Sequence, residues 1–114
     1  MIIFLYGRDS YGISQKLNEL INRYRVKNPS GLNFVSLDFL ENSLADLEDN
    51  LMNSSLMPEK KLIILKNIEK ADPGELLKFT KSQNLAKRDD IISVFVSFNE
   101  TKNKLSEYLI KKPN

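Results

Sequence analysis

The chain has 114 residues, of which 41% are hydrophobic and 28% charged, and its formal net charge of +2 is too small to indicate nucleic-acid binding by itself. This length is that of one globular domain, which buries roughly two-thirds of the surface of its unfolded chain. Because the sequence contains neither cysteine nor histidine, it excludes disulfides, thiol catalysis, and the commonest metal ligand and general base. No apolar run approaches the ~20 residues of a membrane span, and the N-terminus lacks the basic region of a signal peptide, so we expect a cytoplasmic protein without membrane contact.

The first half of the chain alternates strand and helix patterns. Residues 1–6 are nearly all apolar, as in a strand that is covered on both faces. A helical stripe of apolar residues follows over 13–24 and ends at the Asn-Pro-Ser-Gly turn of residues 28–31. Residues 33–39 alternate as a second strand. A second helical stripe over 43–51 opens with the Ser-x-x-Asp spacing of a capping box.

The second half repeats the alternation. Residues 61–66 form the clearest core strand, and Asp-Pro-Gly-Glu at 72–75 predicts the start of a helix that runs to about Leu85. Residues 91–98 are dominated by β-branched and aromatic side chains, which predicts a fourth strand, and a last helix is expected over roughly 102–111. Repeated β-α units with right-handed crossovers predict an α/β protein, a three-layer sandwich around a mostly parallel sheet of four or five strands.

The turn between the first strand and the first helix carries the two glycines of a phosphate-binding P-loop, GxxxxGK(S/T). Gly7 and Gly12 have the required spacing, and Ser14 holds the Ser/Thr position. Ile13 stands where the motif has the lysine that reaches the β- and γ-phosphates, and an aliphatic side chain offers them neither charge nor donor. We therefore predict a degenerate phosphate loop at Gly7, Gly12, Ile13 and Ser14.

Two further features argue against nucleotide hydrolysis. Asp9 lies within the loop, where its carboxylate would occupy the place of a phosphate. The apolar stretch of the core strand, Leu62–Leu65, ends in Lys66 and Asn67, whereas magnesium binding and water activation require an acidic pair there. We expect no catalytic residue, no metal and no cofactor.

Residues 53–58, Asn-Ser-Ser-Leu-Met-Pro, are a polar linker with two adjacent large apolar residues and a terminal proline. Neighbouring residues of a strand point to opposite faces, so Leu56 and Met57 do not both reach a core from an ordinary strand. Two interpretations follow: a linker in which Leu56 covers the sheet, or a hydrophobic plug that inserts into a pocket on a partner. The residues alone favour the linker.

Lysines gather in two parts of the chain, residues 60–70 and 102–112. Phosphate-backbone contact is one interpretation, but acidic residues interrupt both groups and no aromatic residues are interleaved for base stacking. Solvated faces account for these lysines better than a nucleic-acid site does.

Taken together, these motifs make the chain resemble the N-terminal domain of the bacterial DNA polymerase III delta subunit, a clamp-loader component. That family opens with a strand ending in Tyr-Gly and an acidic loop that starts a helix, which correspond to residues 4–10 here. Its later hallmark is a Ser-Leu-Phe element, a few polar residues and a hydrophobic strand with a basic start, which correspond to residues 55–67. The resemblance covers essentially the whole chain, and the order and spacing of the short motifs carry it.

The resemblance implies an AAA+-like fold without a working ATP site and a domain that binds the sliding clamp (the beta subunit) and opens the ring during DNA replication. The clamp-binding element corresponds to Leu56 and Met57, beside Ser55, with Asn53 where such peptides often carry glutamine. With this resemblance the plug interpretation is favoured. Met57 replaces an aromatic residue, which removes rigid contact area but keeps an adaptable apolar side chain.

The resemblance also implies that residues 1–114 are one N-terminal domain of a longer clamp-loader subunit, without its helical lid and collar domains. The other implied partners are the remaining loader subunits, and DNA is reached only through the complex. Two alternatives stay open. One is a small P-loop nucleotide-binding enzyme with a displaced lysine at Lys16, and the other is a receiver-like signalling domain, which the lack of an acidic cluster after the first strand disfavours.

Overall fold

The structure, a computed structural model, describes residues 1–52, 59–100 and 102–111. Within these residues, four strands and four α-helices alternate, with one short 3₁₀ helix, η1, after the third strand. Their bounds are β1 Ile2–Tyr6, α1 Ser10–Lys27, β2 Phe34–Asp38, α2 Leu44–Met52, β3 Lys61–Lys66, η1 Ile68–Lys70, α3 Pro73–Ser82, β4 Ile91–Ser97 and α4 Lys104–Lys111.

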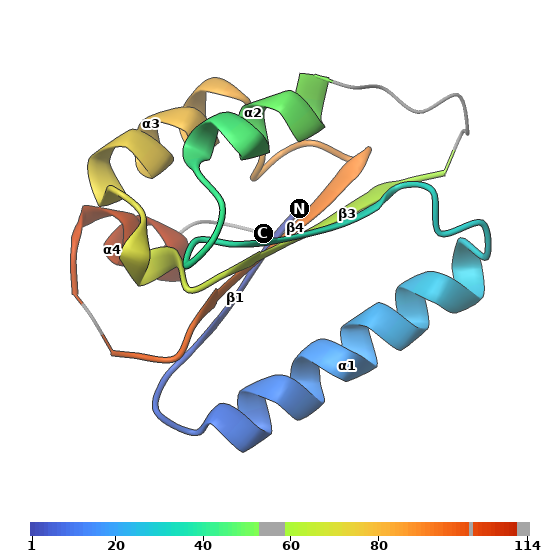
Figure 1. Ribbon diagram of the computed structural model, residues 1–114, viewed down its shortest axis with the longest axis horizontal. Coiled ribbons are helices and arrows are strands. Elements are labelled where there is room, and N and C mark those ends of the chain that lie inside the picture. The colour runs from blue at the N-terminus through green and yellow to red at the C-terminus, as the bar shows by residue number, and fades with distance from the viewer. Residues whose placement is uncertain (53–58, 101, 112–114) are drawn as a thin grey trace.

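The four strands form one sheet in the order β1-β4-β3-β2. Every neighbouring pair runs parallel. Each connection must therefore return from the carboxyl end of one strand to the amino end of the next, and each connection contains a helix. Figure 1 shows α1 alone on one face of the sheet and α2, α3 and α4 together on the other. The predicted α/β sandwich with a parallel sheet is confirmed.

The core has two halves that meet at the sheet. Ile63 and Leu65 of β3 pack on the side of α2, α3 and α4, whereas Leu62 and Ile64 pack on the side of α1. All four side chains are at most 1% exposed. A central parallel strand is covered on both faces, which explains why β3 is apolar throughout instead of alternating.

The helix starts follow the caps that the sequence predicts. The Asp72 carboxylate accepts hydrogen bonds from the backbone N–H groups of Gly74 and Glu75 at 2.9 and 3.1 Å, which satisfies donors that the first helical turn leaves free. At α2, the Asp46 carboxylate accepts from the backbone N–H of Ser43 at 2.8 Å, which is the reaching-back half of a capping box.

The prediction that the third helix continues to about Leu85 is wrong, because α3 ends at Ser82. Asn84 adopts a left-handed conformation with φ 54°. Its N–H donates to the Lys81 carbonyl and that of Leu85 donates to the Thr80 carbonyl, at 3.1 and 3.2 Å. These two bonds form a Schellman motif, which ends a helix and lets the chain reverse. Leu85 still reaches the core from the turn and is 1% exposed.

A second asparagine, Asn67, is also left-handed, with φ 56°, directly after β3. Its side-chain amide donates to the Asp38 carboxylate at 2.8 Å. The exposed side chain of Asn84 makes no such bond within the part of the chain that the structure describes. The two positions therefore share a backbone conformation but differ in what the side chain contributes.

We predict that Asn84→Gly leaves the free energy of unfolding within about 0.5 kcal/mol of wild type or raises it, because glycine adopts this conformation without steric cost. Asn67→Gly is expected to lower it by about 1.5 kcal/mol through loss of a hydrogen bond to a charged group. Urea unfolding of both variants measures the difference. Equal effects at the two positions would contradict the role assigned to the Asn67 amide.

Candidate functional site

The predicted phosphate loop is a tight turn at the carboxyl end of β1. Gly7 has φ 133°, a conformation that strains any side chain, and its N–H donates to the Ser97 carbonyl at 3.2 Å. Gly12, Ile13 and Ser14 lie in the first turns of α1. The structure therefore brings the four residues of the predicted loop into one strand-to-helix connection.

The N-terminus of α1 is capped by the protein itself. The Asp9 carboxylate accepts a hydrogen bond from the backbone N–H of Gly12 at 3.0 Å. A Cβ atom at position 12 would lie 2.4 Å from Asp9 Oδ2, so glycine is what allows the carboxylate to approach this closely. In a P-loop the N–H groups of this turn bind phosphate, whereas here one of them already binds an anionic side chain.

The side chain at the lysine position of the motif points into the protein. Ile13 is 8% exposed and packs with Leu17, Ile64 and Val96 between α1 and the sheet. Ser14 and Lys16 are exposed on α1. The absence of nucleotide binding stays a prediction, and the conformation of the turn is consistent with it.

The carboxyl ends of β2 and β3 meet through the Asp38–Asn67 hydrogen bond described above. The Asp38 carboxylate also accepts from the Leu40 N–H at 2.9 Å. These two hydrogen bonds, the Asn67 bond foremost, lower the pKa of the Asp38 carboxyl, with Lys66 adding a favourable charge. Among the described residues no group of three or more acidic side chains is arranged to bind a metal ion.

A lowered pKa in the folded state means that Asp38 stabilises the fold above the carboxyl's unfolded pKa, about 3.9, and that this contribution is lost as the pH falls through the folded value. We predict that Asp38→Asn is less stable than wild type at pH 7 and that the difference disappears between pH 4 and pH 2. Thermal unfolding across this range measures it. A constant difference would show that the Asp38 charge does not stabilise the fold.

The predicted clamp-binding residues Asn53, Ser55, Leu56 and Met57 lie outside the described residues. Both flanks of their segment are described, because α2 ends at Met52 and the chain is placed again from residue 59 to the start of β3. The flanks lie at the edge of the sheet where the parallel strands begin, opposite the edge that carries the phosphate-loop turn.

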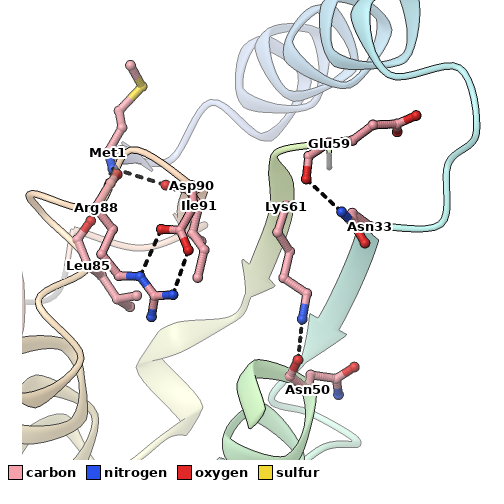
Figure 2. Close-up of polar contacts among 9 residues, drawn as sticks. All are labelled: Met1, Asn33, Asn50, Glu59, Lys61, Leu85, Arg88, Asp90 and Ile91. Atoms are coloured by element: carbon pink, nitrogen blue, oxygen red, sulfur yellow. Dashed lines mark hydrogen bonds and ion pairs between the residues drawn. The ribbon is translucent and has the colours of Figure 1, made fainter. Parts of the chain in front are cut away.

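Long-range polar contacts hold the flanks in place. The Lys61 ammonium donates to the Asn50 carbonyl in the last turn of α2, and the Asn33 amide donates to the Glu59 carbonyl at 2.7 Å (Figure 2). The buried Tyr24 hydroxyl donates to the Lys60 carbonyl. Together these contacts tie the end of α2, the start of β3 and helix α1 to one another.

The electrostatics of this edge follow from burial. Burial lowers the pKa of the Lys61 ammonium, and the nearby Arg88 charge acts in the same direction. Burial likewise raises the pKa of the Tyr24 hydroxyl, with the Glu59 charge adding to the effect. The Lys61 ammonium and the Tyr24 hydroxyl lose hydration free energy when they are buried, and the hydrogen bonds that they donate to carbonyl oxygens compensate this loss.

The loop before β4 is fixed at the same edge. The N-terminal ammonium of Met1 donates to the carbonyls of Leu85, Arg88 and Ile91 at 3.1, 2.7 and 3.1 Å. The Arg88 guanidinium binds the Asp90 carboxylate through two hydrogen bonds of 2.9 and 2.8 Å (Figure 2). A bidentate pair of this kind fixes the orientation of both side chains.

Sequence reasoning missed the roles of Asn33, Lys61 and Tyr24. In the sequence, Lys61 looks like a solvated lysine before an apolar strand. Tyr24 looks like an ordinary core residue in the apolar stripe of a helix. Each binds a carbonyl at least 11 positions away along the chain. Only the packing of α1, α2 and β3 brings these partners together.

We predict that Lys61→Met, which keeps the aliphatic stem but removes the ammonium, lowers the free energy of unfolding by about 1–2 kcal/mol, because a partly buried carbonyl loses a charged donor. Lys60→Met removes an exposed ammonium next to it and is expected to change stability by less than about 0.5 kcal/mol. Chemical denaturation compares the two. Equal losses would mean that the Asn50 contact does not stabilise the fold.

Three comparisons with known proteins bear on this arrangement. The family model described as DNA polymerase III, delta subunit, matches residues 4–112. No curated protein matches the chain. Among solved structures, the DNA clamp loader delta protein of Bacillus subtilis is similar, with a TM-score of 0.69 and 20% sequence identity over 96% of this chain and 35% of that one.

The structural likeness shows the shared fold, and the chain spans about a third of the length of the Bacillus protein. The family match extends across both edges of the sheet, from β1 to the end of α4. None of the described helices combines the length and the apolar character that a membrane span requires.

Proposed function

The chain belongs to the DNA polymerase III delta subunit family, and we propose that it acts in DNA replication as the clamp-loader domain that binds a sliding clamp through residues 53–58. The observation that carries this proposal is the family match over residues 4–112. The similar fold of a clamp loader delta protein supports it.

In this proposal Leu56 and Met57 are the anchors that enter an apolar cleft on the clamp, and Asn53 and Ser55 make polar contacts beside them. Two adjacent apolar side chains in a polar segment have the character of a binding hot spot, in which a few buried residues supply most of the binding energy. The hydrogen bonds of Lys61 and Asn33 support the proposal, because fixed flanks lower the entropy lost on binding.

Ring opening then requires no catalysis by this domain. A protein that binds the open ring more tightly than the closed ring shifts the equilibrium toward the open form by the difference between the two affinities. Exposure of the segment would be controlled by ATP binding in the other loader subunits. Such a role in replicating DNA implies a cytoplasmic protein whose contact with DNA is made through the complex.

We further propose that the turn at Gly7, Gly12, Ile13 and Ser14 binds no nucleotide and that the domain is not an enzyme. Ile13 packs in the core and the Asp9 carboxylate binds the Gly12 N–H, so a phosphate at this turn would meet an anion and no lysine. Titration with ATP in the presence of magnesium tests this. Measurable affinity would favour the alternative, a small P-loop nucleotide-binding enzyme.

We predict that the double variant Leu56→Ala/Met57→Ala binds the sliding clamp from the same source at least about thirtyfold more weakly than wild type, the effect of removing a hot spot. Isothermal titration calorimetry measures the affinity, and wild-type binding is expected to show the negative heat-capacity change of apolar burial. Met57→Phe is expected to tighten binding, because an aromatic ring adds rigid contact area.

The matched control is Leu40→Ala/Ile110→Ala, which removes two side chains that are 62% and 56% exposed elsewhere on the surface. Its affinity for the clamp is expected to equal that of wild type. Absence of binding by the folded wild-type domain, or equal losses in both double variants, would contradict the proposed role of residues 53–58.

A further inference from the structure

A groove runs between the C-terminal half of α1 and the strands beside it. Its volume is about 610 Å³. The floor consists of apolar side chains from β1, β3 and β4 near the edge where these strands begin, with Leu20 of α1 at the side. Among the described elements, α1 is alone on this face of the sheet (Figure 1) and does not cover it completely. The side chains of Ile3 and Ile92 therefore stay only partly buried.

The rim of the groove is mainly cationic. Arg23 and Lys27 lie one turn apart on α1, and Lys60 directly precedes β3. Among the residues that the structure describes, Glu59 is the acidic residue at the rim. Its carboxylate accepts a hydrogen bond from the Ser30 hydroxyl at 2.7 Å. All three cations are exposed, so the groove combines an apolar floor with a positively charged border.

This combination fits a protein partner better than a small molecule. Small-molecule sites place a few polar groups inside a pocket, where they converge on the ligand. Here the Tyr24 hydroxyl binds the Lys60 carbonyl, and the charges of Arg23, Lys27 and Lys60 stand at the rim. An apolar centre surrounded by a polar rim is the arrangement of a protein–protein contact, in which Arg and Tyr are enriched.

The groove also includes the residues that directly follow the proposed clamp-binding segment. Glu59 and Lys60 line it, and they follow residues 53–58 directly in the chain. A protein that is bound at that segment therefore has surface within reach of the groove. The positive rim selects for carboxylates on that surface, and the apolar floor selects for a branched aliphatic side chain between them.

We propose that this groove is a second contact for the protein that binds residues 53–58, and that it accepts an acidic surface segment of that protein with an aliphatic side chain at its centre. The inference rests on the proposed function and assigns different roles to the groove and to residues 53–58. The rim attracts and orients the partner, and the anchors at 53–58 hold it.

The kinetics of binding to the sliding clamp test this division. Arg23→Glu/Lys27→Glu is expected to slow association about tenfold at low ionic strength and to reduce its salt dependence, because charges at a rim act mainly on the rate of encounter. Dissociation is expected to change little. The anchor variant Leu56→Ala/Met57→Ala should instead accelerate dissociation. Surface plasmon resonance at several salt concentrations resolves both rates.

The matched control is Arg8→Glu/Lys102→Glu, which makes the same change in charge with two exposed residues at the opposite edge of the sheet. Its association rate is expected to stay near that of wild type. For the floor, Ile92→Thr keeps a β-branched residue in the strand and is expected to raise the dissociation rate about fivefold. Thermal unfolding verifies that each variant is folded.

Unchanged kinetics in both groove variants, together with loss of binding in the anchor variant, would overturn the groove as a contact and leave the proposed function standing. Equal slowing by the rim variant and its control would overturn it too, because net charge alone would then explain the effect. Absence of wild-type binding to the clamp would overturn both the groove and the proposed function.

Discussion

The pairing of β3 with β4 at the centre of a parallel sheet is the constraint on which the rest of the structure depends. These two strands are covered on both faces, and Ile64, Leu65, Val94 and Phe95 are fully buried as a result. Parallel neighbours cannot be joined by a tight hairpin, so every connection crosses the length of the sheet. All strand beginnings therefore share one edge and all strand ends share the other, which separates two groups of functional candidates.

At the edge of the sheet where the strands end, polar groups form hydrogen bonds with side chains of the same protein. Asp9 binds the Gly12 N–H, and Asn67 binds Asp38. In a nucleotide hydrolase of related design, a phosphate and a magnesium ion would bind at comparable positions. In this chain, intramolecular hydrogen bonds are made at both positions, which supports the proposal of a domain that binds another protein.

At the edge where the strands begin, buried polar groups are directed to backbone carbonyls. Lys61, Asn33 and Tyr24 each bind a carbonyl close to one end of the segment at 53–58. Each of these three donors has an acceptor, although the buried Asn33 Oδ1 has no hydrogen-bond partner among the described residues. The contacts therefore fix local geometry without leaving these donors unpaired. The groove beside α1 lies at the same edge, as its proposed role as a second contact requires.

The sequence by itself determined the alternation of strands and helices, the cap at Asp72 and the Asp46 half of the capping box, because periodicity and capping are local properties. It also determined the aliphatic side chain at the lysine position of the loop. The predicted end of the third helix near Leu85 is wrong, because this apolar residue keeps the spacing of the helix but reaches the core from a turn. Tertiary structure alone decided the strand order, the groove and the contact between Lys61 and Asn50. These features join residues far apart in the chain, and only the packing of helices against the sheet sets the distances between them.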